Sequence, residues 1–245
     1  RAPGPCDSIT AAVAETWSPA RQDAIGAAVR ASDEPGALAA WDRFVPAADA
    51  YASDWTQQKQ STCRALERLD GAGDLELWRT LAARDACLDQ SMALLRALVE
   101  RYRSRPEDVA GSDTALRSLG QSLDRCRAEN LTGLRDAGAG RDPGRQRQVM
   151  RIEAAVAEAT ADELAGDYEA AVTGARDAAV AAAGLDYGPL VAAASLRAGR
   201  SASLLRHPRE AAMWLTRAEE AATRWQEDGL LTNTHIKLIK LTTLN

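Results

Sequence analysis

The chain has 245 residues and a formal net charge of −5, from 30 basic and 35 acidic residues. Alanine fills 52 positions, whereas there is one phenylalanine and there are four tyrosines. Because alanine is the best helix former and β-sheets pack bulky side chains, this composition excludes a large sheet and predicts an all-α fold. The apolar fraction of 46% is enough to build the core of one or two domains.

The charge distribution excludes nucleic acid as a partner. Residues 1–147 carry 20 basic and 22 acidic side chains, and residues 148–245 carry 10 and 13, so neither half has the basic excess that phosphate binding requires. No run of about 18 apolar residues occurs, so we expect no membrane-spanning helix in this sequence. The chain begins without an initiator methionine or a signal-peptide pattern, and we expect it to be a piece of a longer protein.

Helix start signals mark the first elements. Asp7 or Ser8 is expected to cap a short helix, and Ser18 before Pro19 is expected to cap a second one. Residues 33–36 (Asp-Glu-Pro-Gly) end the second helix.

Apolar residues then recur at spacings of three and four over residues 37–69 and again over residues 78–102. This periodicity predicts two long antiparallel helices, with a kink at Pro46 in the first. A shorter helix is predicted from about Asp113 into Cys126. The apolar stripes of the long helices place three tryptophans in the core: Trp41, Trp55 and Trp78.

A change of composition separates two parts of the chain. Residues 132–147 contain four glycines and a proline without apolar periodicity, which predicts a linker or a long connection. We therefore expect a helical domain over residues 1–131 and a second region over residues 148–245.

The second region contains an internal repeat. A single shift along the sequence, the 41-residue shift, aligns Leu164 with Leu205 and also 169–171 (Glu-Ala-Ala) with 210–212. Each unit is predicted to be a pair of helices joined by a tight turn. The predicted helices are 148–165, 168–182, 189–205 and 208–227, and a truncated third unit begins at residue 230. Helix pairs at a fixed period stack into a superhelix with a concave surface.

The first unit resembles the tetratricopeptide repeat at Ala159, Leu164, Gly166-Asp167-Tyr168, Ala171 and Ala178. The resemblance implies a tetratricopeptide-like α-α superhelix whose concave face binds a protein or peptide. Transferring the groove positions of that family and applying the 41-residue shift gives seven candidate binding residues: Glu153, Val156, Thr160, Glu163, Arg197, Ser201 and His235. The alternative is that this face is solvated or covered by the N-terminal helices.

Residues 6–126 are similar to the segment that follows the transmembrane helix in myxobacterial receptor-type serine/threonine protein kinases. The similarity is carried by Cys6, 17–21 (Trp-Ser-Pro-Ala-Arg), Tyr51, Trp55, 62–64 (Thr-Cys-Arg), 84–89 (Arg-Asp-Ala-Cys-Leu-Asp) and 123–126 (Leu-Asp-Arg-Cys). It implies an upstream cytoplasmic kinase domain, one membrane helix absent from this chain, and an extracytoplasmic sensing role for the chain itself. No glycine-rich phosphate loop, His-Arg-Asp or Asp-Phe-Gly occurs here, so this segment is not expected to be an enzyme.

Four cysteines, at positions 6, 63, 87 and 126, all lie in the first region. They suit either two disulfides in an oxidising compartment or four buried thiols in a cytoplasm, and four cysteines allow three connectivities. Cys87 and Cys126 lie at almost equal distances along the chain from the turn near Pro106, so hairpin geometry favours Cys87 with Cys126. Cys6 with Cys63 is then the second candidate pair.

The sequence predicts no catalytic residue, no cofactor and no metal. It contains neither Gly-x-Ser-x-Gly nor His-Glu-x-x-His, its cysteines have no Cys-x-x-Cys spacing, and its histidines are remote from them. The function expected is a non-catalytic protein- or peptide-binding sensor or scaffold region of a receptor-type kinase. The alternatives are a cytoplasmic tetratricopeptide scaffold or regulator with free thiols and, third, a small-ligand-binding enzyme.

Overall fold

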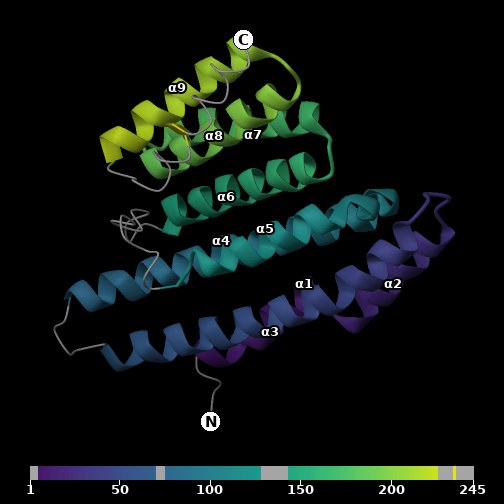
Figure 1. Ribbon diagram of the computed structural model, residues 1–245. Helices are drawn as coiled ribbons and strands as arrows, with labels where there is room; N and C mark the ends of the chain where they lie inside the picture. Colours follow the sequence, from purple (N-terminus) through teal and green to yellow (C-terminus); the bar gives the residue numbers. More distant parts are fainter. Residues whose placement is uncertain (1–4, 70–74, 128–142, 226–233, 236–245) are drawn as a thin grey trace. The chain divides into compact units, whose positions relative to one another are not determined.

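The computed structural model describes residues 5–69, 75–127, 143–225 and 234–235. Within these ranges the chain is all-α and contains no strand, so the predicted fold class is confirmed. The chain divides into two compact units, Arg1–Ala137 and Gly138–Asn245 (Figure 1).

The first unit is built around two long helices. Its elements are η1 Pro5–Ser8, α1 Ile9–Thr16, α2 Pro19–Ala31, α3 Ala37–Leu69, α4 Leu75–Ser104, η2 Pro106–Gly111 and α5 Ser112–Asp124. α3 and α4 run side by side and antiparallel, as predicted (Figure 1). α3 continues through Pro46.

Of the two predicted helix caps, the structure shows the one at Ser18 and not one at Ser8. Ser18 Oγ accepts a hydrogen bond from the Arg21 N–H at 3.4 Å, and Pro19 occupies the first helical position. Ser8 provides no side-chain cap, because η1 leads directly into α1 and leaves Ser8 in helical backbone geometry.

An aromatic cluster forms the centre of the first unit. The Phe44 ring lies 5.8 Å from both Trp17 and Trp41 and 5.1 Å from Tyr102, measured between centroids. Elsewhere along the same pair of helices, Trp55 Nε1 donates a hydrogen bond to the Leu88 carbonyl at 2.6 Å. Such edge and stacked contacts, together with the burial of large rings, stabilise the packing of α1 and α4 on α3.

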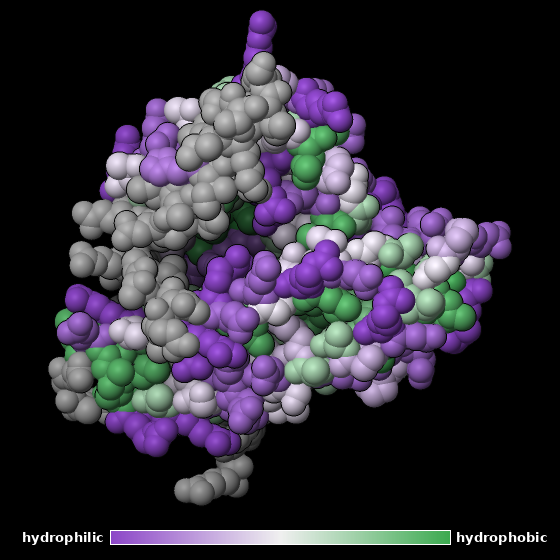
Figure 2. Space-filling model, viewed as in Figure 1, coloured by the Kyte–Doolittle hydropathy of each residue, from purple (hydrophilic) through white to green (hydrophobic). Residues whose placement is uncertain are grey.

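The prediction that Trp78 lies in the core is wrong, because this residue is 47% exposed. The apolar stripe of α4 extends to its amino end, but the buried face of α4 begins only at Ala83. Leu75 and Leu77 at the same end of α4 are also exposed, and Figure 2 shows a hydrophobic patch at the lower left, at this end of the α3–α4 hairpin. Periodicity is a property of one helix, whereas burial requires a neighbour.

Residues 143–225 of the second unit form four successive helices: α6 Pro143–Leu164, α7 Tyr168–Gly184, α8 Gly188–Leu204 and α9 Pro208–Trp225. They correspond to the two predicted helix pairs. α6 begins before the predicted start, inside the predicted linker, because Pro143 suits the first turn of a helix. The predicted third unit lies outside the described residues apart from Thr234 and His235.

The turns of this unit recur at a constant spacing. Gly166, Asp186 and Arg206 each have a positive φ, of 86°, 49° and 61°, and each lies two positions before the next helix. One helix pair therefore repeats from Gly166 to Arg206, a period that is one position shorter than the predicted shift. The positions of the turns define the period of the repeat. Identical side chains at one sequence shift do not define it, because matches within alanine-rich helices also arise by chance.

Small residues let these helices approach closely. Ala175, Ala194, Ala198 and other alanines of the unit have essentially no exposed surface. A Cβ added at Gly199 would lie 2.8 Å from Leu215 Cγ, so α8 and α9 meet at a point where only glycine fits. Alanine and glycine thus build the interior of the second unit, much as large rings build that of the first.

Candidate functional site

A buried carboxylate lies between α6 and α8. Glu163 Oε1 is 3.0 Å from Arg197 Nη1 and 2.9 Å from Arg200 Nη2. Its other oxygen, Oε2, accepts a hydrogen bond from Ser201 Oγ at 2.9 Å. We call these four residues the Glu163 cluster.

Helix geometry explains why the cluster forms. Arg197, Arg200 and Ser201 lie at positions i, i+3 and i+4 of α8 and therefore share one face. α6 contacts α8 as well as α7, which brings the last turn of α6, with Glu163, against that face. The ion pairs thus join two helices that are not consecutive in the chain.

The cluster is buried at its carboxylate and open at its arginines. The Glu163 side chain is 2% exposed, whereas the side chains of Arg197 and Arg200 are 21% and 41% exposed. Two guanidinium groups face a single carboxylate, so the cluster carries a surplus of positive charge. Each guanidinium has five N–H donors, and the bonds to Glu163 use one nitrogen of each.

The other predicted groove residues have different environments. Thr160 is buried and its hydroxyl donates to the Val156 carbonyl at 2.7 Å, and Val156 packs against the helical core. Glu153 is half-buried. His235 Nε2 lies 2.6 Å from Glu219 Oε1 of α9. Of the seven predicted residues, Glu163, Arg197 and Ser201 share one cluster in the described part of the chain.

Arg200 is the one residue of the Glu163 cluster that is not among the predicted groove residues. The 41-residue shift matches Thr160 to Ser201, whereas the shorter period of the turns matches it to Arg200. The spacing Arg-x-x-Arg-Ser over residues 197–201 was the available signal, because it places both arginines on one helix face.

A second ion cluster joins the two long helices of the first unit. Lys59 Nζ lies 2.8 Å from Asp85 Oδ1 and 2.7 Å from Asp89 Oδ1, and it also donates to the Asp85 carbonyl at 3.2 Å. The Lys59 side chain is only 12% exposed. Since all three ammonium donors have partners on α4, this cluster links α3 to α4 and offers no donor to a ligand.

The four cysteines form two pairs at disulfide distance. The Cα atoms of Cys6 and Cys63 are 5.8 Å apart, and those of Cys87 and Cys126 are 5.5 Å apart. Cys87–Cys126 is the pair that hairpin geometry favours, and Cys6–Cys63 is the second candidate pair. Cys6–Cys63 ties η1 to α3, and Cys87–Cys126 ties α4 to the residues that follow α5.

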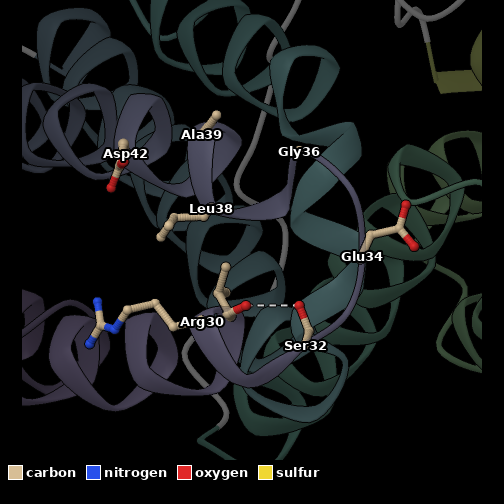
Figure 3. A pocket seen from close by; sticks show the side chains of 8 residues that line it. Arg30, Ser32, Glu34, Gly36, Leu38, Ala39 and Asp42 are labelled. Atoms are coloured by element: carbon tan, nitrogen blue, oxygen red, sulfur yellow. Dashed lines mark hydrogen bonds between the residues drawn. The ribbon is translucent and has the colours of Figure 1, made fainter.

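A surface pocket of about 490 Å³ lies between the end of α2 and the start of α3 (Figure 3). Its charged side chains, Arg30, Glu34 and Asp42, are exposed to solvent. The Ser32 hydroxyl donates to the Val29 carbonyl at 2.8 Å. A binding site needs polar groups held in place by their surroundings, and no ion pair or hydrogen bond among the described residues holds the three charged side chains of this pocket.

Comparison with known proteins identified no relative: no family model, no curated protein and no solved structure matches this chain. Among the described helices, none contains an apolar stretch long enough to cross a membrane. The resemblances to tetratricopeptide repeats and to receptor-kinase segments therefore rest on the residues quoted from the sequence.

Proposed function

We propose that this chain is a non-catalytic binding region of a receptor-type serine/threonine protein kinase, in which the second unit binds a protein or peptide. Binding would bias the attached kinase through the first unit. The sequence resemblance suggests the kinase context. The single structural observation that supports binding by the second unit is the Glu163 cluster.

The Glu163 cluster favours a partner with an acidic group. Its arginines are held by a buried carboxylate, so their side chains lose little freedom when they bind. Both guanidinium groups remain partly exposed, at 21% for Arg197 and 41% for Arg200. An arginine binds a carboxylate through two parallel hydrogen bonds, and a carboxylate side chain or chain terminus of the partner would offset the surplus charge.

The cysteine pairs support an extracytoplasmic location. Disulfides persist in oxidising compartments and are rare in cytosolic proteins, and both pairs of this chain lie at disulfide distance. The competing proposal, a cytoplasmic scaffold with free thiols, requires the same four cysteines to remain reduced.

Selection from a displayed peptide library tests the binding role. We expect peptides with acidic residues or a free carboxyl terminus to be enriched on the full chain. Arg200→Glu should weaken the binding of selected peptides by about tenfold or more, because it places a like charge beside the ligand. Arg209→Glu on α9 makes the same charge change at an exposed position and should leave binding unchanged.

Two results would contradict the binding role. One is a library that yields no peptide above background while the chain remains helical by circular dichroism. The other is an equal loss of binding with Arg200→Glu and Arg209→Glu, which would mean that only the net charge matters.

The location is tested by the state of the cysteines in cells. Protein treated with a thiol-blocking reagent at lysis should show the intact mass of the unlabelled chain, because disulfide-bonded cysteines cannot be alkylated. After reduction and a second treatment with the reagent, its mass should rise by four labels. Four blocked thiols before reduction would instead support the cytoplasmic scaffold.

A further inference from the structure

A third potential metal ligand lies beside one of the two cysteine pairs. The sulfur atoms of Cys6 and Cys63 and a carboxylate oxygen of Glu67 all lie within 4.8 Å of one another. Cys6 comes from η1, whereas Cys63 and Glu67 come from α3. Two helices, α1 and α2, separate Cys6 from the other two residues in the sequence, so only the fold brings all three together.

The local geometry suits chelation by the two α3 residues. Cys63 and Glu67 stand at positions i and i+4 of a continuous helix, so their side chains lie one above the other on the same face. Cys6 approaches that face from a separate element, with a Cα–Cα distance of 5.8 Å to Cys63.

Reduction would place the sulfur atoms at the separation that zinc requires. Two thiolates bound to tetrahedral zinc, with Zn–S bonds of about 2.3 Å, are about 3.8 Å apart. Two sulfur atoms that are no longer bonded must separate to a similar, van der Waals, distance. The cysteine backbones therefore need little movement to exchange a disulfide for two metal ligands.

The other cysteine pair provides an internal contrast. Cys87 and Cys126 have nearly the same Cα–Cα distance, 5.5 Å, but the group formed by Cys6, Cys63 and Glu67 is the one such ligand set among the described residues. The contrast lies in this third ligand and not in the exposure of the cysteines, because each pair joins a buried cysteine, Cys6 or Cys126, to a half-buried one.

We propose that the reduced Cys6–Cys63 pair and Glu67 form a binding site for Zn²⁺ or a similar thiophilic divalent cation, with water as the fourth ligand. A dithiol reductant supplies two electrons and two protons to the disulfide and is itself oxidised to a disulfide. Zinc then binds both sulfur atoms as thiolates and displaces their two protons to water. The disulfide and the metal site are therefore alternative states of the same residues.

Cobalt binding to the reduced chain tests the proposal. The full chain is reduced with a dithiol, freed of reagent and titrated with Co²⁺ without oxygen, and Zn²⁺ is then added as a competitor. We expect one Co²⁺ per chain, with the thiolate charge-transfer and visible bands of tetrahedral cobalt, and loss of these bands when Zn²⁺ displaces it. The double variant Cys87→Ser, Cys126→Ser should give the same spectrum.

Variants of the proposed ligands separate this site from adventitious thiolate binding. Cys6→Ser and Cys63→Ser should abolish the charge-transfer band, and Glu67→Gln should weaken binding by about tenfold or more. Glu76→Gln, which removes an exposed carboxylate from α4, should have no effect. A band that survives Cys6→Ser, or equal affinities for Glu67→Gln and the parent chain, would overturn the proposal.

Circular dichroism covers the case in which reduction unfolds the first unit. Since the ligands come from η1 and α3, Zn²⁺ should then restore helical signal in the parent chain and should restore less in Glu67→Gln. A reduced chain that stays unfolded in excess Zn²⁺ would also overturn the proposal.

Discussion

The two units build helical interiors in opposite ways. The first packs large rings and leucines between helices of 33 and 30 residues and links its elements with two cysteine pairs. The second packs alanines and glycines between helices of 17 to 22 residues joined by short turns.

This difference follows from side-chain size. Large side chains hold helix axes apart and contribute much buried area each, whereas small side chains let backbones approach and distribute the stabilisation over many short contacts. The first unit should therefore depend on a few residues and cross-links, and the second on the absence of added bulk. The following variants test this comparison.

Of the variants compared below, loss of the Cys87–Cys126 link should have the largest effect. Replacing both cysteines by serine opens a loop with a sequence separation of 39 residues, and the unfolded-chain entropy gained predicts a loss of about 4 kcal/mol. Peptide-resolved hydrogen exchange should show faster exchange in α4 and α5. Equal acceleration in α7 and α8 would show that the second unit depends on the first.

Glu163→Gln should be the most damaging single charge change in the second unit. It leaves two arginines facing a neutral amide, and we expect a loss of about 2 to 3 kcal/mol, measured by urea denaturation. Glu158→Gln on the exposed side of α6 is the matched control and should change stability by less than about 0.5 kcal/mol. Similar losses for the two variants would mean that the cluster is not a stabilising element.

Gly199→Ala tests the close packing of α8 and α9. Alanine favours helix, but its Cβ would lie 2.8 Å from Leu215 Cγ and 3.0 Å from the Leu215 nitrogen, so we expect a net loss of about 1 to 2 kcal/mol. Gly184→Ala is the control, because its Cβ would meet nothing within 4 Å. Thermal unfolding should separate the two, and a Gly199→Ala chain as stable as Gly184→Ala would contradict the packing argument.

Two tryptophans of the first unit should respond differently to phenylalanine. Trp55 is buried and donates to the Leu88 carbonyl at 2.6 Å, so Trp55→Phe should cost about 1 kcal/mol. Trp78 is 47% exposed, and Trp78→Phe should cost less than about 0.5 kcal/mol. Urea midpoints of the two variants provide the measurement, and equal shifts would place Trp78 in the core after all.

The smallest effect expected is a change in acid sensitivity at Glu100. Hydrogen bonds from Arg103 and Arg21 lower the pKa of the Glu100 carboxyl. Because the folded-state pKa lies below the unfolded one, this stabilisation is present above the ordinary pKa and is lost as the pH falls through the folded value. Glu100→Gln should flatten the stability profile slightly on the acidic side, and Glu107→Gln, at an exposed glutamate of the same unit, should not.

The sequence by itself determined the all-α fold, the two long helices and the helix pairs of the second unit. These depend on alanine content, on periodicity within single helices and on local signals such as Ser18-Pro19. All of them act over a few residues, so no knowledge of distant neighbours is needed.

Only the tertiary structure decided which surfaces are covered and which distant residues meet. The exposure of Trp78, the entry of Arg200 into the Glu163 cluster and the approach of Glu67 to Cys6 each depend on where a second element packs. Packing distance and register between helices arise from the shapes of both partners. The pattern of apolar residues along one helix describes the shape of only one of the two partners.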